Sequence, residues 1–548
     1  MKHWDTKRQA RQARLANGTV HAAGKIVAAD ALVAFLEAVI VPGDRVCLEG
    51  DNQKQADLLA HALAQVDPGK IHDLHMVQSG IVLPEHLDLF DKGIARRLDF
   101  SYSGPQSARI ARMLFGGKIE LGAIHTYLEL FARYFIDLTP QVALIAAVSA
   151  DREGNLYTGP NTEDTPTVVE AASFGNGLVI AQVGEIVEHV PRVDIPGDQV
   201  HFIVDAGKPF YVEPLFTRDP AAVTETQILT AMLAIKGLYQ PYGIRRLNHG
   251  IGFNTAAIEL LLPTYAERLG LKGKICTHWA LNPHPTLIPA IEAGWVEQVH
   301  SFGSEVGMED YIRARSDIFF TGADGSLRSN RAFSQTAGLY ACDLFIGSTL
   351  EIDLTGHSST ITPDRIAGFG GAPNMGSDAR GRRHPSPPWL RSGQEADPDT
   401  PAPLRRGRKL VVQIGETFGE GNAPLFVEAL SALALAEKLD LPLAPVMVYA
   451  DDTTHIITEE GIANLLLCRG KDEREQAIRG VAGFTEVGRQ RDLKMVERLR
   501  ERKVIQRPED LGIDPLDADR SLLAARSIKD LMLASGGLYL PPSRFRNW

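Results

Sequence analysis

Residues 142–148, Val-Ala-Leu-Ile-Ala-Ala-Val, constrain the fold more than any other stretch because every position is apolar. A strand with one solvated face alternates apolar and polar residues, so a continuously apolar run indicates a central parallel strand covered on both faces. The turn-rich loop 149–162 follows it directly. In open α/β sheets, ligands bind beyond the carboxyl ends of the strands. We therefore expect an α/β fold, with this loop as one wall of a site.

Further strands and helices are expected on both sides of this segment. The first 26 residues are polar and basic and are expected to form an arm. Three prolines within residues 208–222 mark the exit from a first domain. Apolar residues at helical spacing predict helices at 28–40, 56–65 and 106–115, and short buried runs predict strands at 45–48, 71–77, 98–100, 177–183 and 200–204.

A second series of strands, loops and helices begins near Thr226 and follows the same order as the first. Residues 143–185 end in Gln-Val-Gly-Glu, and residues 344–416 end in Gln-Ile-Gly-Glu. A chain of 548 residues is also too long for one typical core. We interpret the repeat as an internal duplication and predict two tandem, related α/β domains with mainly parallel sheets, residues 1–225 and 226–548.

Local patterns give three further expectations for the second domain. Residues 344–346, 349–352 and 446–449 are expected to be strands. Residues 380–408 are rich in Arg, Pro and Gly and are expected to be a long exposed loop. Thr458, with acidic residues directly after it, predicts the start of a helix over residues 458–467.

Composition limits the classes of function. The net charge of −11 argues against a general nucleic-acid binder, which would carry a basic surface. No window holds about 18 uninterrupted apolar residues, and the polar N-terminus lacks the apolar run of a secretory signal. The four cysteines are far apart and form no C-x-x-C pair, as expected of free thiols in a reducing compartment. A cytoplasmic protein without a membrane span is the simplest interpretation.

Three glycines within four positions, Gly368, Gly370 and Gly371, form the most unusual local pattern. Glycine is disfavoured inside helices and strands, so the run marks a sharp turn or a close backbone approach. Successive N–H groups from Gly370, Gly371 and Ala372 could stabilise a developing oxyanion. The glycines alone favour a surface turn. Whether the run is a turn or an oxyanion-binding loop must be judged from the surrounding residues.

Several common functional motifs are excluded. No stretch fits the P-loop pattern, and Pro373 stands where a dinucleotide-binding loop needs its third glycine. Neither Gly303–Gly307 nor Gly376–Asp378 has the spacing of a nucleophile elbow. His278 and His284 are isolated from other potential ligands, so we expect hydrogen-bonded loop histidines and no metal site.

Several segments together resemble a known superfamily. Glu351-Ile-Asp-Leu-Thr-Gly356, the glycine run and Thr458-Glu-Glu-Gly-Ile-Ala463 resemble the family I CoA-transferases and acetyl-CoA hydrolases. More specifically, His125-Thr-Tyr-Leu-Glu-Leu-Phe-Ala-Arg-Tyr134, Gly154-Asn-Leu-Tyr-Thr-Gly-Pro-Asn-Thr162 and Val190-Pro-Arg-Val-Asp-Ile-Pro-Gly197 resemble malonate decarboxylase alpha subunits. The resemblance spans nearly the whole chain. It implies two CoA-transferase-like domains that exchange the acetyl group of an acyl-carrier thioester for malonate, releasing acetate through a mixed anhydride.

The resemblance also implies a choice between two chemical routes. In related transferases a glutamate attacks the thioester first, and Glu305, between Gly303 and Gly307, is the candidate here. The motif around it departs from the family pattern, so Glu305 is a nucleophile, an acid that shapes the site, or only a loop carboxylate. In the alternative route malonate attacks the acetyl thioester directly. The direct route is favoured.

A site for the malonate dianion should offer fixed cations, because guanidinium groups bind carboxylates in pairs of hydrogen bonds. The candidate ligands are Arg192, Arg365, Arg380 and Arg383, with Asn155, Asn161 and Thr162 as wall residues from the first domain. The basic pairs at 96–97, 405–406 and 408–409 are candidates for contact with an acidic carrier protein or its phosphate linker.

The resemblance further implies partners. These are an acyl-carrier subunit, decarboxylase beta and gamma subunits, and malonate. The chain itself is expected to bind no cofactor, because the phosphopantetheine-type group belongs to the carrier.

Two alternative functions remain: a CoA transferase or acetyl-CoA hydrolase that acts on free CoA thioesters, and a non-catalytic scaffold that holds the carrier.

Overall fold

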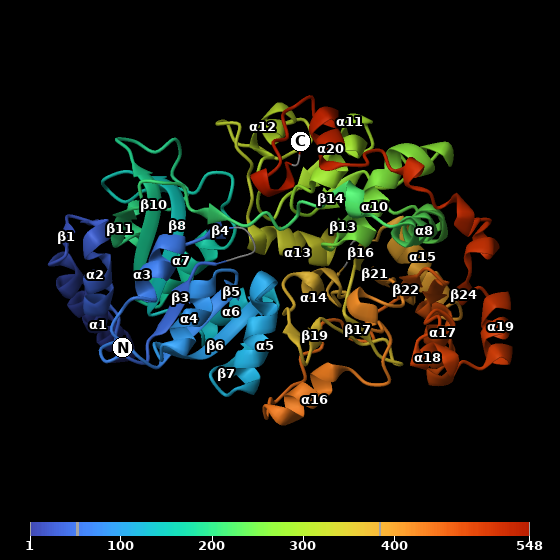
Figure 1. Ribbon diagram of the computed structural model, residues 1–548, viewed down its shortest axis with the longest axis horizontal. Helices are drawn as coiled ribbons and strands as arrows, with labels where there is room; N and C mark the ends of the chain where they lie inside the picture. Colours follow the sequence, from blue (N-terminus) through green and yellow to red (C-terminus); the bar gives the residue numbers. More distant parts are fainter. Residues whose placement is uncertain (1, 51–53, 383–384, 547) are drawn as a thin grey trace.

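The computed structural model describes residues 2–50, 54–382, 385–546 and 548. Two large, mainly parallel sheets lie side by side, one built from the N-terminal part of the chain and one from the C-terminal part (Figure 1). The first contains strands between residues 22 and 205, and the second contains strands between residues 246 and 506. This arrangement confirms the predicted α/β fold.

The central six strands of the two sheets have the same order. In the first sheet the order is β11-β10-β8-β3-β5-β6, and in the second it is β22-β21-β16-β13-β14-β15, with all these neighbours parallel. Numbered along each half, both sheets read 3-2-1-4-5-6, the doubly wound order. The predicted similarity of residues 143–185 and 344–416 therefore corresponds to equivalent strands, since β8 and β10 occupy the same places as β16 and β21.

The bounds of these strands follow the expected buried runs. In the first sheet they are β3 (Arg45–Leu48), β5 (Leu74–Gly80), β6 (Ala95–Tyr102), β8 (Val142–Ala150), β10 (Leu178–Ile186) and β11 (Phe202–Asp205), with β1 (Ala22–Ala23), β2 (Ile26–Val27), β7 (Glu120–Ile124) and β9 (Leu156–Tyr157) outside them. In the second they are β13 (Arg246–His249), β14 (His278–Ala280), β15 (Gln298–His300), β16 (Leu344–Gly347), β21 (Leu410–Ile414) and β22 (His455–Thr458), extended by β23 (Gly461–Asn464) and β24 (Ile505–Gln506).

Helices cover both faces of each sheet. The first half contains α1 (Lys2–Thr19), α2 (Leu32–Val39), α3 (Asp57–Leu63), α4 (Pro84–Asp91), α5 (Ser107–Phe115), α6 (Tyr127–Ile136) and α7 (Thr165–Phe174). The second contains α8 (Glu225–Ala234), α10 (Phe253–Leu261), α11 (Ile288–Glu292), α12 (Glu309–Ala314), α13 (Arg331–Ala341), α14 (Ala372–Met375), α15 (Pro387–Ala396), α16 (Ser431–Lys438), α17 (Lys471–Gly480), α18 (Glu486–Arg489), α19 (Leu493–Glu501) and α20 (Ile528–Ala534). None of the described helices is long and apolar enough to cross a membrane.

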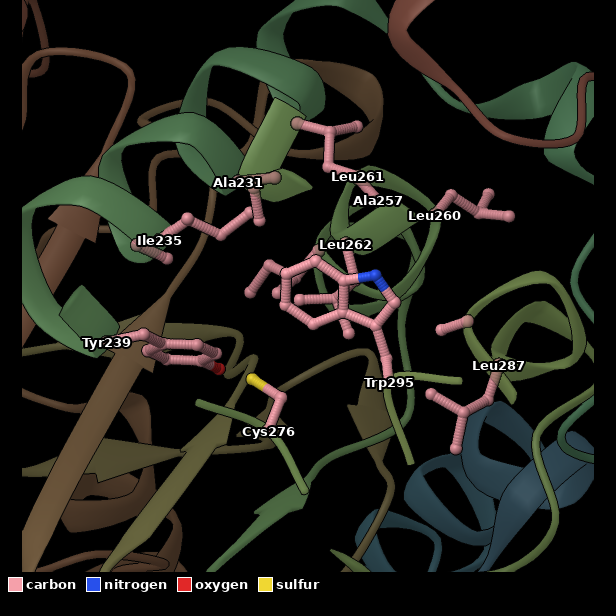
Figure 2. Packing of buried hydrophobic residues seen from close by; sticks show 14 of the residues in the cluster. Ala231, Ile235, Tyr239, Ala257, Leu260, Leu261, Leu262, Cys276, Leu287 and Trp295 are labelled. Carbon is pink, nitrogen blue, oxygen red and sulfur yellow. The ribbon is translucent and has the colours of Figure 1, made fainter. Parts of the chain in front are cut away.

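The core of the second half lies between its sheet and helices α8 and α10. Figure 2 shows Trp295 surrounded by leucines and alanines, with Tyr239 and Cys276 beside it. Helix α8 continues into a π-helical turn, Ile235–Tyr239, and α10 continues into another, Leu262–Ala266. Such turns shift the side chains that follow them, and they are frequent at functional sites. Here the first one carries Tyr239 toward strand β13.

The two halves meet along a seam of main-chain contacts. Residues 365–372, from the second half, pass between the end of β6 and the start of α6 in the first half, where α14 lies near α5 and β7 in Figure 1. The C-terminal tail packs against the second half, where the N–H of Leu540 donates to the carbonyl oxygen of Gly307 at 2.9 Å.

Three local predictions were wrong. The N-terminal arm is helix α1, whose many helix-forming residues lie against α2, with Arg14 paired to Asp44. The predicted exposed loop 380–408 contains helix α15, in which Ser392 and Gly393 are buried. The predicted strand 446–449 makes only an isolated bridge, between Val448 and Ser358.

A fourth prediction, the helix over residues 458–467, was also wrong. Thr458 and Gly461 instead join strands β22 and β23 in a hairpin. Gly461 has φ of +141°, and a side chain there would meet the carbonyl oxygen of Gln506 in the next strand. Pairing with two neighbouring strands outweighs the local helix preference of the acidic residues.

Candidate active site

A cavity of about 390 Å³ opens at the carboxyl ends of the second sheet, between the two halves. Asn248 and His249 reach it from the end of β13, and Gly347 and Ser348 reach it from the end of β16. The strand order reverses between β13 and β16, which is where doubly wound sheets bind ligands. Gly250 is required by this geometry, because a Cβ there would lie 2.9 Å from the Cα of Gly347.

The equivalent point of the first sheet is filled by buried polar side chains. Lys54 is fully buried and donates to the hydroxyl of Thr165, which in turn donates to Glu49 at 2.5 Å. Arg331, from the second half, forms ion pairs with Glu163 and Asp164 beside them. Each of the two related sheets therefore has a potential ligand site. The site of the first sheet is filled by the charged side chains just described, which connect the two halves.

The glycine loop, which we define as residues 368–372, forms one wall of the cavity. Gly368 and Gly370 both have positive φ, +75° and +57°, which glycine adopts at little cost. A Cβ on Gly368 would lie 2.3 Å from the carbonyl oxygen of Ser101, and one on Gly371 would lie 2.3 Å from the amide of Gln335. Each glycine in the run thus has a conformational or steric reason, and the loop is not the surface turn favoured from the glycines alone.

The predicted use of the loop N–H groups needs correction. The N–H groups of Phe369 and Gly370 donate to the carbonyl oxygen of Ser101 at 2.7 and 2.9 Å, and the N–H of Ala372 donates to Phe369 at 3.3 Å. Of the three N–H groups predicted to act as donors, that of Gly371 has no hydrogen-bond partner among the described residues, and the same holds for the N–H of Gly368. Gly370 and Ala372 therefore shape the wall, while Gly371 keeps the predicted donor.

The charged side chains that line the cavity are cationic. Arg218 and Arg365 line it, and neither forms an ion pair with a described carboxylate. Arg218 donates to the carbonyl oxygens of Leu215 and Thr217 at 2.7 and 3.0 Å, and burial lowers its pKa while the nearby Glu305 charge opposes that shift. Of the described residues that line the cavity, none is Asp or Glu. Such a cavity favours an anion, and none of its described lining residues offers a carboxylate nucleophile.

Two of the histidines that line the cavity share a buried glutamate. His249 and His284 line the cavity, and the Nδ1 of each lies 2.9 Å from the same oxygen of Glu259 in α10. Burial alone would raise the pKa of the Glu259 carboxyl, but the charges and hydrogen bonds of His284 and His249 hold it well below its ordinary value. Burial lowers the pKa of His249, against the effect of Glu259.

Glu305 lies outside this cavity. Its side chain is fully buried and accepts hydrogen bonds from the N–H groups of Phe216 and Thr217, at 3.2 and 3.0 Å, and from the Thr217 hydroxyl at 2.7 Å. It contributes instead to a second space of about 380 Å³ near Asn161 and Ser304. The carboxylate thus fixes the chain segment that carries Phe216 and Arg218 into the wall of the active-site cavity, which favours a shaping role.

Replacing Glu305 by glutamine tests that role. A nearly isosteric amide keeps one acceptor oxygen, so we expect transfer activity within roughly 10-fold of wild type and an unfolding free energy lower by roughly 1–3 kcal/mol, the usual cost of disturbing a buried hydrogen-bonded charge. Steady-state kinetics and denaturant unfolding measure the two quantities. A complete loss of transfer in a stably folded variant would instead make Glu305 the nucleophile.

Most of the other predicted ligands are engaged elsewhere. Arg192 pairs with Asp194 and Asp324, both at 2.6 Å, and its guanidinium lies 4.8 Å from the centre of the Tyr157 ring. Asn155 binds Asp151 and the N–H of Gly197, each at 2.8 Å. These contacts engage both side chains, and neither residue belongs to the lining of this cavity.

The remaining predicted ligands divide into three groups. Arg365 lines the cavity as expected. Asn161 accepts from the N–H of Ser304 at 3.1 Å, and the N–H of Thr162 donates to the Ser329 hydroxyl at 3.3 Å, so both residues join loops of the two halves. Arg380 is exposed and does not belong to the cavity lining. Arg383 lies outside the described residues.

The predicted basic pairs are only partly accessible. Arg96 and Arg97 are exposed on β6. Lys409 is fully buried and donates to the carbonyl oxygen of Gly338 at 2.7 Å, and burial lowers its pKa to about 8. The pair at 408–409 therefore cannot act as a two-residue docking patch, because one member faces the interior.

Several lining residues were missed by the sequence reasoning. Arg218 lies in the proline-rich exit from the first domain, and Tyr102 and Tyr127 come from β6 and α6. One detectable signal was His249-Gly-Ile-Gly252, a strand end followed by two glycines and a helix. His284 was predicted to be a hydrogen-bonded loop histidine, and its bond to Glu259 confirms that prediction while its position gives it a chemical role.

Comparison with known proteins places this geometry in a family. The family model described as "Malonate decarboxylase, alpha subunit, transporter" matches residues 3–548. An acetyl-S-ACP:malonate ACP transferase from Malonomonas rubra is 62% identical over 526 residues, covering 96% of this chain and 95% of that protein.

Solved structures agree with the sequence comparison. A Pseudomonas malonate decarboxylase hetero-tetramer in complex with malonate contains a chain that is 59% identical, with a TM-score of 0.97 and complete coverage of both chains. A malonate decarboxylase alpha subunit from Acinetobacter baumannii is 55% identical, with a TM-score of 0.96 over 99% of this chain and 100% of that one.

More distant structures, each 15% identical, show the fold alone. They are a citrate lyase alpha subunit from Streptococcus mutans, with a TM-score of 0.59 over 95% of this chain and 87% of that one, and an acyl-CoA transferase from Escherichia coli O157:H7, with a TM-score of 0.51 over 80% and 87%. The predicted CoA-transferase-like fold is confirmed by these neighbours. The chain belongs to the malonate decarboxylase alpha subunit family.

Proposed function

We propose that this chain transfers an acyl carrier from acetate to malonate: acetyl-carrier thioester and malonate give malonyl-carrier thioester and acetate. The observation that carries the proposal is the active-site cavity, which is lined by Arg218, Arg365 and Gly371 and whose described lining holds no carboxylate. The 62% identical relative is named for this activity, and it is an enzyme. The function is that of an acyl-carrier-protein transferase.

The reaction proceeds by direct attack of malonate. One malonate carboxylate attacks the acetyl carbonyl carbon, the resulting oxyanion expels the carrier sulfur, and a mixed acetyl-malonyl anhydride forms. The sulfur then attacks the malonyl carbonyl and releases acetate. Arg218 and Arg365 hold the malonate carboxylates, and the Gly371 N–H donates to the oxyanion. Because both acyl groups are bound side by side, proximity lowers the barrier for each step.

The thioester arm of the carrier needs its own route into the cavity. A third space, of about 590 Å³, lies between the edge strand β7 and residues 441–448, and it shares Phe369 and Met447 with the active-site cavity. The shared residues support entry of the arm from this side, so that its thioester reaches the glycine loop. The phosphopantetheine-type group belongs to the carrier in this scheme and is a substrate of the chain.

Membership of a larger assembly follows from the same comparison. The 59% identical chain comes from a malonate decarboxylase hetero-tetramer. We place this chain in an equivalent complex, with an acyl-carrier subunit that delivers acetyl groups and decarboxylase beta and gamma subunits that consume the malonyl carrier. The exposed residues Arg96 and Arg97 lie at the start of β6, where Arg97 is paired with Glu120 of β7, and they remain candidates for contact with the carrier.

An exchange assay tests the proposed function. The purified chain is supplied with acetyl-carrier or acetyl-CoA, with malonate, citrate, acetate or no acceptor, and both acetate and the new thioester are measured. We expect malonyl-carrier formation with malonate only. Acetate release that ignores malonate would show a hydrolase, equal use of acetyl-CoA a CoA transferase, and carrier binding without exchange a scaffold.

A further inference from the structure

The buried Glu259 orients two histidines at the cavity wall. His249 and His284 both place Nδ1 2.9 Å from the same carboxylate oxygen, and the hydroxyl of Thr286 donates to the other oxygen at 2.5 Å. An ionised carboxylate only accepts hydrogen bonds, so each histidine must donate from Nδ1. The Nε2 atom of each ring therefore faces away from Glu259.

The two Nε2 atoms have different surroundings. The Nε2 of His249 lies 2.8 Å from the Tyr239 hydroxyl, so both nitrogens of that ring are occupied. The Nε2 of His284 has no hydrogen-bond partner among the described residues, and its ring lines the cavity. Phe216 stacks against His284, with the ring centres 5.4 Å apart, which fixes the plane of the imidazole.

Transfer of an acyl group requires a proton near the sulfur atom. In the tetrahedral intermediate an unprotonated thiolate leaves less readily than the malonate carboxylate, because a thiol is the weaker acid, and the thiol formed must lose its proton again before the second attack. Among the described lining residues, arginines stay protonated, unperturbed tyrosines titrate near pH 10, and burial raises the pKa of Tyr102 further. Histidine is the side chain that exchanges protons near neutral pH.

We propose that His284 is a catalytic residue that gives a proton to the carrier sulfur in the first half-reaction and takes it back in the second; this rests on the function proposed above. Collapse of the first tetrahedral intermediate breaks the C–S bond, and the sulfur receives the proton from Nε2. When the thiol attacks the malonyl carbonyl, Nε2 recovers that proton, a new C–S bond forms, and acetate leaves with the electron pair of the broken C–O bond. The histidine ends each cycle in its starting state.

Glu259 acts through His284 and is a positioning residue. Its carboxylate holds the Nδ1–H of His284, directs Nε2 into the cavity and stabilises the protonated ring. The arrangement matches the general pattern in which a carboxylate orients a catalytic imidazole.

The test uses the intact chain with acetyl-carrier and malonate, and it compares four proteins: wild type, His284→Gln, His284→Ala and His278→Gln. His278 lies at the start of β14, outside the cavity lining, and serves as the matched histidine control. We expect His284→Gln to lower kcat about 100-fold, the usual contribution of a general acid, with the KM for malonate nearly unchanged. Added imidazole should restore part of the activity of His284→Ala, and His278→Gln should resemble wild type.

Each outcome decides the proposal. Activity of His284→Gln within about 3-fold of wild type, a value far below the usual general-acid effect, would overturn it. A raised KM for malonate with unchanged kcat would also overturn it, because His284 would then be a malonate ligand. Thermal unfolding of each variant separates a folding defect from a chemical one, and imidazole rescue requires a folded protein. Absence of malonate-dependent exchange in wild type would refute the proposed function instead.

Discussion

Replacing Gly368 by alanine is expected to lower the rate of acetyl transfer about 100-fold, the scale reported for active-site displacements of about 1 Å. The added Cβ would lie 2.3 Å from the main-chain oxygen of Ser101, and the residue would keep φ of +75°, which L residues avoid. The Ser101 backbone and the glycine loop cannot move apart without breaking the hydrogen bonds that Phe369 and Gly370 donate to Ser101. The loop must therefore move within the cavity, carrying the Gly371 N–H with it.

A control substitution at Gly421 separates the effect of the steric clash at Gly368 from the effect of the positive φ angle. Gly421 has φ of +67°, similar to Gly368, but a Cβ there would have no neighbour within 4 Å. Gly421→Ala should lose roughly 1–2 kcal/mol of unfolding free energy from the dihedral alone and keep its activity. Steady-state transfer rates and denaturant unfolding of both variants measure this. Equal activity of the two variants would show that the position of the glycine loop does not matter for transfer.

Replacing Arg218 by methionine should weaken malonate binding. The guanidinium is largely buried, lines the cavity and has no described carboxylate as an ion-pair partner, so a bound dianion supplies the missing charge. Loss of a charge-assisted hydrogen bond costs about 1.5–3 kcal/mol, so the KM for malonate should rise about 10- to 100-fold. The KM for acetyl-carrier should change little, because the thioester carries no negative charge at its reacting end.

The arginine control is Arg192→Met. Arg192 forms two ion pairs outside the cavity, with Asp194 and Asp324, so its loss should reduce stability and leave the KM for malonate unchanged. Initial rates at varied malonate concentration, measured for both variants, show whether malonate binds at Arg218 or at Arg192. If Arg192→Met and not Arg218→Met raised the KM, malonate would bind in the first half and the assignment of the cavity would be wrong.

The fold could be predicted largely from local patterns. The apolar run at β8 predicted a central parallel strand, and the repeated Gln-x-Gly-Glu ends identified β10 and β21 as equivalent strands. The errors arose where distant partners decide the structure. Thr458 and Gly461 form a hairpin because strand β24, more than 40 residues later in the chain, pairs with β23. A local capping pattern contains no information about such a partner.

The site could be predicted only in part, for the same physical reason. Glycines that must approach another backbone are visible in the sequence, and the loop at Gly368 was found that way. Whether an arginine is available for substrate depends on its neighbours in space. Arg192 is neutralised by Asp324, 132 residues away, and Glu305 is held by Thr217, 88 residues away. Arg218 and His284 gain their roles from the fold, and no local motif marks either one.

One isotope experiment tests the central claim, that malonate attacks the acetyl thioester without an enzyme carboxylate between them. The chain, in excess over acetyl-carrier, is mixed with malonate whose carboxylates carry ¹⁸O, and the acetate from a single turnover is examined by mass spectrometry. Direct attack places one malonate oxygen in the anhydride bridge, so the first acetate released should contain one ¹⁸O atom. Unlabelled acetate in that first turnover, with ¹⁸O retained on a glutamate of the protein, would contradict the account.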